Sequence, residues 1–347
     1  MSEKIFYSSA DALRAAGLPA RPELEDVEKL YPVKINSYCL KQINPALGSN
    51  DPFYRQFLPD PEELADPDSS FDPLSEAEQM PVAKLIHRFP DRVVLLATFQ
   101  CAVRCRFCFR KRTWCCGSSD TDLSDRELNM AVDYLRRTPT VREVLISGGD
   151  PLLLPFERLQ KIVSAIAALE NIEIIRVATR LPVTDPAAVD DKTIDFLAKT
   201  HGVWMATHFN HPAELTPEST ALLRKIVASG IPVINQSVLL KGVNDHAGIL
   251  EELFRKLVSL RVKPHYLFHV DPVRGVRHFA TGIECGLDIM RHFRRNLSSL
   301  AVPTFAIDLP EGGGKVALQP DYRDEYGRFP DIHNCRYIAY PDKFDAK

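Results

Sequence analysis

From residue 92 onwards the chain alternates short apolar, β-branched runs with amphipathic helical segments. The runs have strand length, and most are too continuously apolar for strands with one solvent-exposed face, which favours parallel strands covered by helices. Between them, apolar residues recur at the i, i+3, i+4, i+7 spacing of a helix face, as in 128–135 and 159–166. The predicted strands are residues 92–98, 143–147, 172–178, 203–208, 232–238, 263–270 and 303–308.

This succession of β-α units predicts an α/β fold with a closed or partly closed barrel, because right-handed connections between neighbouring parallel strands wind steadily one way. An open doubly wound sheet is the competing fold. We expect three regions: a small helical and Pro-rich extended arm at 1–85, a partial (β/α) TIM-like barrel at 86–310, and a lysine-bearing loop with a C-terminal tail at 311–347.

Composition excludes several classes of partner. The 347 residues carry a formal net charge of −3, which gives no strong field for nucleic acid or an anionic membrane. The N-terminus does not resemble a signal peptide, and no apolar run approaches the roughly 18 residues that span a bilayer. We therefore expect a cytoplasmic protein with neither a nucleic-acid nor a membrane partner.

Polar residues stand at the ends of the predicted strands. In a barrel of parallel strands these ends meet at one mouth, where the βα loops carry the chemistry. The sequence therefore predicts one site built from a cysteine-rich loop after the first strand and from Ser147–Asp150, Arg180, His208, Gln236, Asp271 and Asp308 at the later strand ends.

The loop after the first strand holds Cys101, Cys105 and Cys108 in a C-x₃-C-x₂-C array. Structural zinc normally takes four ligands in paired spacing, and no partner pair is obvious. Three close thiolates instead suit three irons of a [4Fe–4S] cluster whose fourth iron stays open for a ligand. Three zinc-binding or structural cysteines are the alternative. We expect the remaining cysteines to be free thiols: Cys39, Cys115, Cys116, Cys285 and Cys335.

Two glycine-rich segments add to this pattern. In Ser147-Gly148-Gly149-Asp150, the glycines allow close approach of the backbone, and we expect their N–H groups to face a ligand. Near the C-terminus, three glycines precede Lys315 without the spacing of a phosphate loop. That segment suits a lysine held beside pyridoxal phosphate (PLP), and an ordinary flexible loop is the alternative.

Together these motifs closely resemble the lysine 2,3-aminomutase family of radical S-adenosylmethionine (SAM) and PLP enzymes. The resemblance runs from about His87 to Gln319 with the motifs in the family's order. It rests on the cysteine array with Phe107 and a following Phe-Arg, Ser-Gly-Gly-Asp, Thr-His-Phe-Asn-His211, Asn-Gln-Ser-Val-Leu-Leu240 with Gly-Val-Asn-Asp245, His278-Phe279, and Gly-Gly-Gly-Lys315.

The resemblance implies a role for each residue at the barrel mouth. It implies cluster ligation by Cys101, Cys105 and Cys108, PLP attachment to Lys315 with Arg88 at the phosphate, a substrate carboxylate on Arg110, and the distal ammonium of lysine on Asp271 and Asp308. It implies a SAM site lined by Ser147, Gly148, Gly149, Asp150, His208 and Gln236. The implied reaction interconverts L-lysine and β-lysine, with an electron donor such as a flavodoxin or ferredoxin.

The chain also departs from the family pattern. Of the cysteines, only Cys335 follows the predicted barrel, whereas the family has a longer zinc-binding extension; structural zinc is therefore not expected, and a homo-oligomer stays possible. Three alternatives remain: the same reaction on another amino acid, β-lysine supply for modification of elongation factor P, and a non-catalytic iron–sulfur or zinc module.

Overall fold

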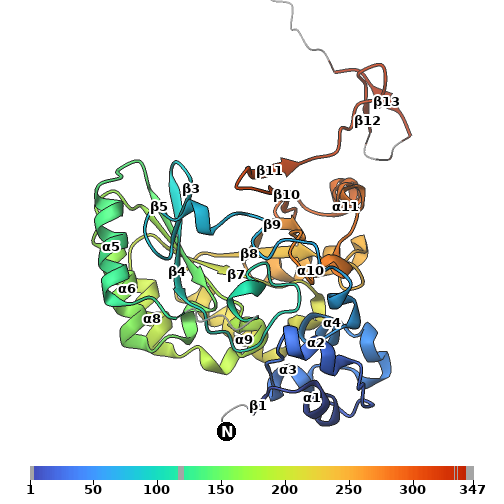
Figure 1. The fold of residues 1–347 in the computed structure, drawn as a ribbon. Coiled ribbons are helices and arrows are strands. Elements are labelled where there is room, and N and C mark those ends of the chain that lie inside the picture. Colours follow the sequence, from blue (N-terminus) through green and yellow to red (C-terminus); the bar gives the residue numbers. More distant parts are fainter. Residues whose placement is uncertain (1–3, 116–120, 332, 334, 341–347) are drawn as a thin grey trace, which may run out of the picture.

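Nine strands form one sheet in the computed structural model, which describes residues 4–115, 121–331, 333 and 335–340. The strand order is β11-β10-β9-β8-β7-β6-β5-β4-β3, so neighbours in the sheet are neighbours in the chain (Figure 1). The bounds are β3 (Leu85–Phe89), β4 (Arg92–Thr98), β5 (Glu143–Gly148), β6 (Ile174–Ala178), β7 (Val203–Thr207), β8 (Val233–Leu239), β9 (Val262–His269), β10 (Thr304–Leu309) and β11 (Gly314–Leu318).

The predicted barrel-like α/β fold is confirmed. All seven predicted strands are present as β4 to β10, and each pairs in parallel with the next. A doubly wound sheet would reverse its strand order at a switch point, and this order never reverses. The described strands leave the wall open between β3 and β11, so the barrel is partial.

Two antiparallel edge strands were not predicted. Strand β3 pairs with β4, and β11 pairs with β10 so that Lys315 stands directly opposite Asp308. The expectation that Lys315 lies in a loop is therefore wrong: it is on a strand that Gly314 begins, and Gly312 and Gly313 lie in the turn before it. The predicted region boundaries, which stay predictions, fall inside β3 and inside this turn.

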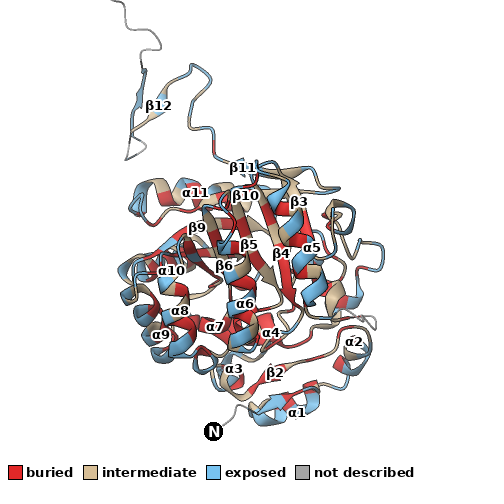
Figure 2. Cartoon of the chain, turned by 90° about the vertical axis from the view of Figure 1, so that its left-hand side faces the viewer, coloured by how far each residue is buried: buried red, intermediate tan, exposed pale blue. Residues whose placement is uncertain are grey.

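Helices cover the outer face of the sheet, and their buried sides face the strands (Figure 2). Each follows the apolar pattern of its sequence; α9, for example, starts after the cap Thr216, whose side chain accepts from the Ser219 N–H. The bounds are α5 (Asp125–Arg136), α6 (Phe156–Ala167), α7 (Leu181–Thr184), α8 (Asp191–Lys199), α9 (Pro217–Ala228), α10 (Ala247–Ser259) and α11 (Ile283–Asn296).

The N-terminal region is helical and then extended, as predicted. Its elements are β1 (Ile5–Phe6), α1 (Ser9–Ala15), α2 (Leu24–Leu30), β2 (Ile35–Asn36), α3 (Ser37–Lys41) and α4 (Pro52–Phe57). Residues 60–80, called the arm below, follow with two short 3₁₀ turns and no strand. The arm forms hydrogen bonds with the segments that follow β9 and β10. The Glu311 N–H donates to the Pro73 carbonyl (2.9 Å), and the Arg274 N–H donates to the Ser70 carbonyl (2.9 Å).

Beyond β11 a small hairpin of β12 (Phe329–Pro330) and β13 (Tyr337–Ile338) extends away from the barrel (Figure 1). No helix in the described ranges is long and apolar enough to cross a membrane.

One tight contact fixes α11 against β10, the strand that carries Asp308. A Cβ on Gly286 would lie 2.1 Å from Cζ of Phe305, whose ring is fully buried, whereas a Cβ on Gly282 would meet nothing within 4 Å. We expect Gly286→Ala to lower the free energy of unfolding by about 1–3 kcal/mol through overpacking, despite the better helix propensity of alanine. Gly282→Ala is the control in urea unfolding; equal stability of the two variants would contradict this packing account.

Candidate active site

The three array cysteines lie in the irregular loop that follows β4, at the barrel mouth. Burial raises the pKa of the Cys101 thiol well above its usual value, and the neighbouring Cys108, Asp150 and Cys105 raise it further. Three thiols that lie this close to one another are a donor set that suits iron. They would bind the metal as thiolates, and the iron would supply the compensating positive charge. Within the described part of the chain, no three Cys, His, Asp or Glu side chains gather as a site for a single metal ion.

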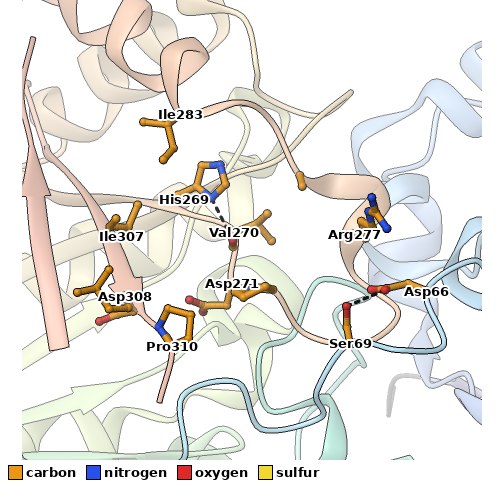
Figure 3. Close-up of a pocket in the computed structure, with 13 residues that line it drawn as sticks. Asp66, Ser69, His269, Val270, Asp271, Arg277, Ile283, Ile307, Asp308 and Pro310 are labelled. Carbon is orange, nitrogen blue, oxygen red and sulfur yellow. Dashed lines mark hydrogen bonds between the residues drawn. The ribbon is translucent and has the colours of Figure 1, made fainter. Parts of the chain in front are cut away.

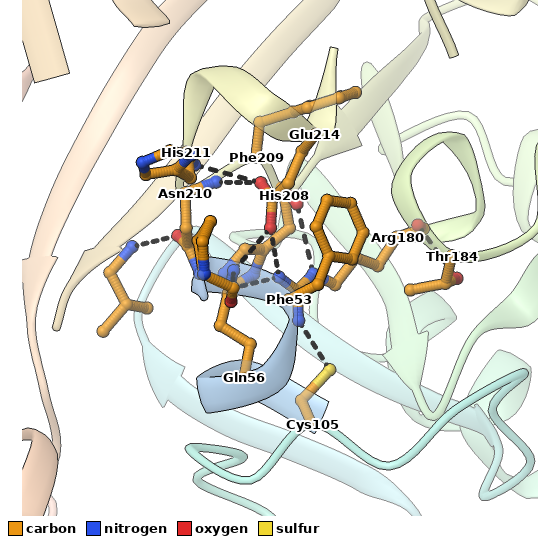
Figure 4. Close-up of polar contacts among 12 residues, drawn as sticks. Phe53, Gln56, Cys105, Arg180, Thr184, His208, Phe209, Asn210, His211 and Glu214 are labelled. Carbon is orange, nitrogen blue, oxygen red and sulfur yellow. Dashed lines mark hydrogen bonds and ion pairs between the residues drawn. The ribbon is translucent and has the colours of Figure 1, made fainter. Parts of the chain in front are cut away.

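Arg180, the second residue after β6, joins this loop to the rest of the mouth (Figure 4). Its Nη1 donates to Sγ of Cys105 (2.7 Å), and its Nη2 donates to Oε1 of Gln56 (2.6 Å) and Oε1 of Glu214 (2.9 Å). The guanidinium also lies over the Phe107 ring at 4.9 Å. One side chain therefore ties the cysteine loop to α4 and to the loop after β7.

Glu214 is the buried anion that balances this arginine, and its side chain is fully buried. Its second oxygen accepts from the backbone N–H groups of Asn210 (2.5 Å) and His211 (3.1 Å). Gln56 donates to the same carboxylate and accepts from Asn210. Gln56 and Glu214 were not predicted as site residues, because neither stands at the end of a predicted strand or in a recognised motif.

The Ser147–Asp150 turn lies at the mouth, but the N–H group of Gly149, which we expected to face a ligand, already has a backbone partner. The N–H groups of Gly149 and Asp150 donate to the carbonyls of Thr98 (2.6 Å) and Gln100 (2.7 Å) rather than facing a cavity. A Cβ on Gly148 or Gly149 would lie 2.2 Å from one of these same oxygens, and Gly148 has φ +112°. The glycines therefore let the ends of β4 and β5 approach each other.

Asp150 braces the next strand end. Its carboxylate accepts from the N–H groups of Arg180 (2.7 Å) and Leu181 (3.1 Å) and from the Thr179 hydroxyl (2.9 Å). Burial raises its pKa to about 6, although these donors act in the opposite direction. Asp150 thus holds the backbone from which the Arg180 side chain starts.

His208 and Gln236 lie on the two following strands. His208 comes directly after β7, and its buried Nε2 has no hydrogen-bond partner in the described chain. Burial, with Arg180 nearby, lowers the pKa of His208 well below its usual value, so the ring is neutral. Gln236 sits in β8 at a shift in register and is half-buried. A buried, unpaired ring nitrogen is a site for a polar ligand group such as those of SAM.

Lys315 lies across the mouth on β11, above the rings of Tyr266 (4.6 Å) and Phe268 (4.2 Å). Its Nζ is 3.8 Å from Oδ2 of Asp308. Burial lowers the pKa of Lys315, although Asp308 acts in the opposite direction. A half-buried amine with a lowered pKa, beside aromatic rings, fits a lysine that forms a covalent bond to PLP.

Arg88 is placed beside this lysine by the unpredicted strand β3. Its Nη1 lies 4.0 Å from Oδ1 of Asp308. The arm holds the guanidinium in place, since Nε donates to Oε1 of Gln79 (2.6 Å) and Nη2 donates to the Leu74 carbonyl (3.0 Å). The predicted cofactor arginine and lysine therefore flank one aspartate.

Asp271 and Asp308 line one cavity of about 370 Å³ between the ends of β9 and β10 and the arm (Figure 3). Burial and the nearby Asp308 raise the pKa of Asp271 to about 7. Asp66 of the arm, which was not predicted, lines the same cavity. Carboxylates that are largely buried in one cavity favour a cation, which points to a positively charged ligand group.

Arg110 is buried in the mouth, but one edge of its guanidinium is already paired. Its Nε and Nη2 donate to the two carboxylate oxygens of Glu76 at 2.9 and 2.7 Å, and Nη1 lies 3.4 Å from Oγ of Ser147. Burial alone would raise the pKa of Glu76, yet Arg110 and Arg112 outweigh it and hold the pKa at about 2. Only the Nη1 side of Arg110 is therefore left for a substrate carboxylate.

A second arm carboxylate pairs with the cysteine loop. Glu63 accepts from Nε and Nη2 of Arg106 at 2.9 and 2.7 Å and from Nζ of Lys111 at 2.6 Å, and all three side chains are almost fully buried. Neither this pairing nor that of Glu76 was predicted. The arm is thus fastened across the mouth by ion pairs with the residues that flank the cysteines.

Comparisons with known proteins agree with this geometry. Residues 95–253 match the model of the radical SAM superfamily, and residues 290–325 match that of lysine-2,3-aminomutase. An L-lysine 2,3-aminomutase from Clostridium subterminale is 42% identical over 83% of this chain and 69% of its own, and one from Methanococcus maripaludis is 40% identical over 88% and 71%. A glutamate 2,3-aminomutase from Clostridioides difficile is 36% identical over 86% and 70%.

The barrel, the cysteine loop and these matches define a radical SAM enzyme. Within that superfamily the chain belongs to the lysine 2,3-aminomutase family. It is therefore an isomerase, and its cofactors are a [4Fe–4S] cluster, SAM and PLP.

Removing Arg180 tests whether it holds the mouth together. We expect Arg180→Gln to lower the free energy of unfolding by about 3–5 kcal/mol, because Glu214 stays buried without its cation. The control is Arg142→Gln, which removes an exposed ion pair with Glu173 (3.0 Å) and should cost about 0–1 kcal/mol. Similar midpoints and slopes for both variants in urea unfolding would refute the role assigned to Arg180.

Proposed function

We propose that the protein interconverts L-lysine and β-lysine by moving the amino group between neighbouring carbons. The observation that carries this proposal is the pair Asp271 and Asp308 in one cavity, with Lys315 opposite Asp308. A carboxylate pair suits the distal ammonium of lysine, whereas the distal carboxylate of glutamate would be repelled there.

The cluster and SAM would be held on the β4–β8 side of the mouth. We assign the iron ligands to Cys101, Cys105 and Cys108, whose loop is fastened by Arg180 and Glu63. We assign the SAM site to Ser147, Gly148, Gly149, Asp150, His208 and Gln236. The unpaired buried nitrogen of His208 supports this assignment. For Asp150 the contacts support a positioning role, since its carboxylate is used by neighbouring backbone.

PLP would be held on the β3 and β9–β11 side. We assign its covalent attachment to Lys315 and its phosphate to Arg88. The rings of Tyr266 and Phe268, adjacent to the lysine amine, offer an apolar surface beside a planar cofactor. Asp308 lies close to both basic groups and keeps the lysine near its position.

The substrate carboxylate is assigned to Arg110. Glu76 fixes the orientation of that guanidinium and leaves Nη1 facing Ser147. Because a guanidinium offers several N–H donors in a rigid plane, it can hold Glu76 on one edge and a second carboxylate on the other.

The protein's part in the reaction is positioning and exclusion of water. When bound, the reduced cluster with SAM supplies a carbon-centred radical, and PLP supplies the conjugated ring that allows nitrogen to migrate. Arg110 and the two aspartates would fix the two ends of the amino acid so that its middle carbons lie between the two cofactors. The arm would cover the mouth and keep solvent away from radical intermediates.

Further partners follow from this chemistry. We assign reduction of the cluster to a small electron carrier such as a flavodoxin or ferredoxin, and we place the protein in the cytoplasm, where the exposed Cys335 stays reduced. A homo-oligomer, no nucleic-acid partner and no membrane partner complete the proposal. The same reaction on glutamate is the second candidate, because one relative carries that name.

An amino-acid panel tests the proposal. We expect protein reconstituted anaerobically with iron, sulfide, PLP, SAM and dithionite to convert lysine, and not glutamate or alanine, to its β-isomer, measured by mass spectrometry. Cys108→Ala and Lys315→Ala should form no product, because each removes the assigned site of one cofactor. Faster turnover of glutamate or alanine than of lysine would reject the substrate assignment.

The raised pKa of Asp271 predicts a pH dependence. Below a pH of about 7 this carboxyl is protonated in the free enzyme and no longer attracts an ammonium, so kcat/KM for lysine should fall about tenfold per pH unit. Asp271→Asn should have a low kcat/KM that lacks this fall. A wild-type profile that stays flat from about pH 8 to pH 6 would show that Asp271 does not bind the substrate in its charged form.

A further inference from the structure

The cavity between β9, β10 and the arm contains one carboxylate that no family motif assigns. Asp66 comes from the arm, and Asp271 and Asp308 come from the barrel (Figure 3). The apolar side chains that line the same cavity include Val270, Ile283 and Ile307. The cavity therefore combines an aliphatic wall with three acidic groups.

Asp66 is buried, with 6% of its surface exposed, and is only half satisfied. Its Oδ1 accepts from Oγ of Ser69 (2.6 Å), whereas its Oδ2 is buried and has no hydrogen-bond partner in the described ranges. An unsatisfied buried polar atom costs roughly 1–3 kcal/mol, and more when it is charged. A ligand that donates to Oδ2 would remove this cost.

The cavity wall offers little cationic compensation of its own. Arg277 is the basic residue that lines it, but this side chain is exposed, and no ion pair joins it to any of the three acids in the described chain. Arg88 and Lys315 lie near Asp308 rather than at the arm side of the cavity. Aliphatic walls beside carboxylates, of which Asp66 has no cationic partner in the described chain, match the chemistry of an alkylammonium group on a methylene chain.

We propose that Asp66 is a substrate-binding residue, through which the arm accepts a hydrogen bond from the distal ammonium of a basic amino acid. The inference rests on the proposed function, which assigns that ammonium to Asp271 and Asp308. An ammonium has three N–H donors, and Asp66 supplies a third carboxylate to receive them. The arm then selects the substrate as well as covering it.

Binding without turnover tests the inference. The probes are L-lysine and L-norleucine, which has the same carbon chain with a hydrogen in place of the ammonium, titrated into PLP-loaded protein without SAM. We expect Asp66→Asn to weaken lysine binding by about 10- to 100-fold, the usual range for a hydrogen bond to a charged group, and to leave norleucine binding unchanged. Asp68→Asn, an exposed acid on the same arm, should change neither.

The outcomes separate this inference from the proposed function. Wild-type protein that binds norleucine as well as lysine would reject the cationic substrate itself. A wild-type preference for lysine that persists in Asp66→Asn, or equal loss of both ligands in that variant, would reject Asp66 alone. Asp66→Glu keeps the charge and should retain part of the preference for lysine, and the iron and PLP content of each variant reports whether its site is intact.

Discussion

Two buried carboxylates on the N-terminal arm hold the mouth of this barrel together. Glu63 is enclosed by Arg106 and Lys111, and Glu76 by Arg110 and a second arginine, all in the loop that carries the cysteines. Buried ion pairs of this kind cost desolvation to form but are expensive to break, because the partner left behind stays buried and charged. These ion pairs therefore favour one arrangement of the arm and the cysteine loop over the many conformations in which the pairs are broken.

This arrangement connects the two halves of the chemistry. The same arm that pairs with the cysteine loop also holds Arg88 through Gln79 and contacts the turn before Lys315. The arm, which contains no strand, thus contacts both β3 and the turn before β11, the strands at opposite edges of the sheet. The arm bridges these two edges of the partial barrel, since no strand of the described sheet closes the gap between them.

The seven central strands could be predicted from the sequence, because buried parallel strands are continuous apolar runs. The polar residues at the ends of these strands could be predicted in the same way. It was insufficient for β3 and β11, which are short edge strands carrying polar residues such as Arg88 and Lys315. The ion pairs of the arm acids could not be predicted, because their partner cations lie 34 or more residues along the chain. The role of the glycines in Ser147–Asp150 was also misjudged, since only the fold shows that two strand ends meet there.

The buried ion pairs make the arm a fixed part of the active site. Hydrogen–deuterium exchange of the cofactor-loaded protein, followed by mass spectrometry, measures this directly by comparing peptides from residues 60–80 with peptides from β4 and the cysteine loop. We expect the arm and the loop to exchange slowly and at similar rates, because their buried ion pairs must break together. Arm peptides that exchange within seconds while β4 stays protected would contradict this expectation.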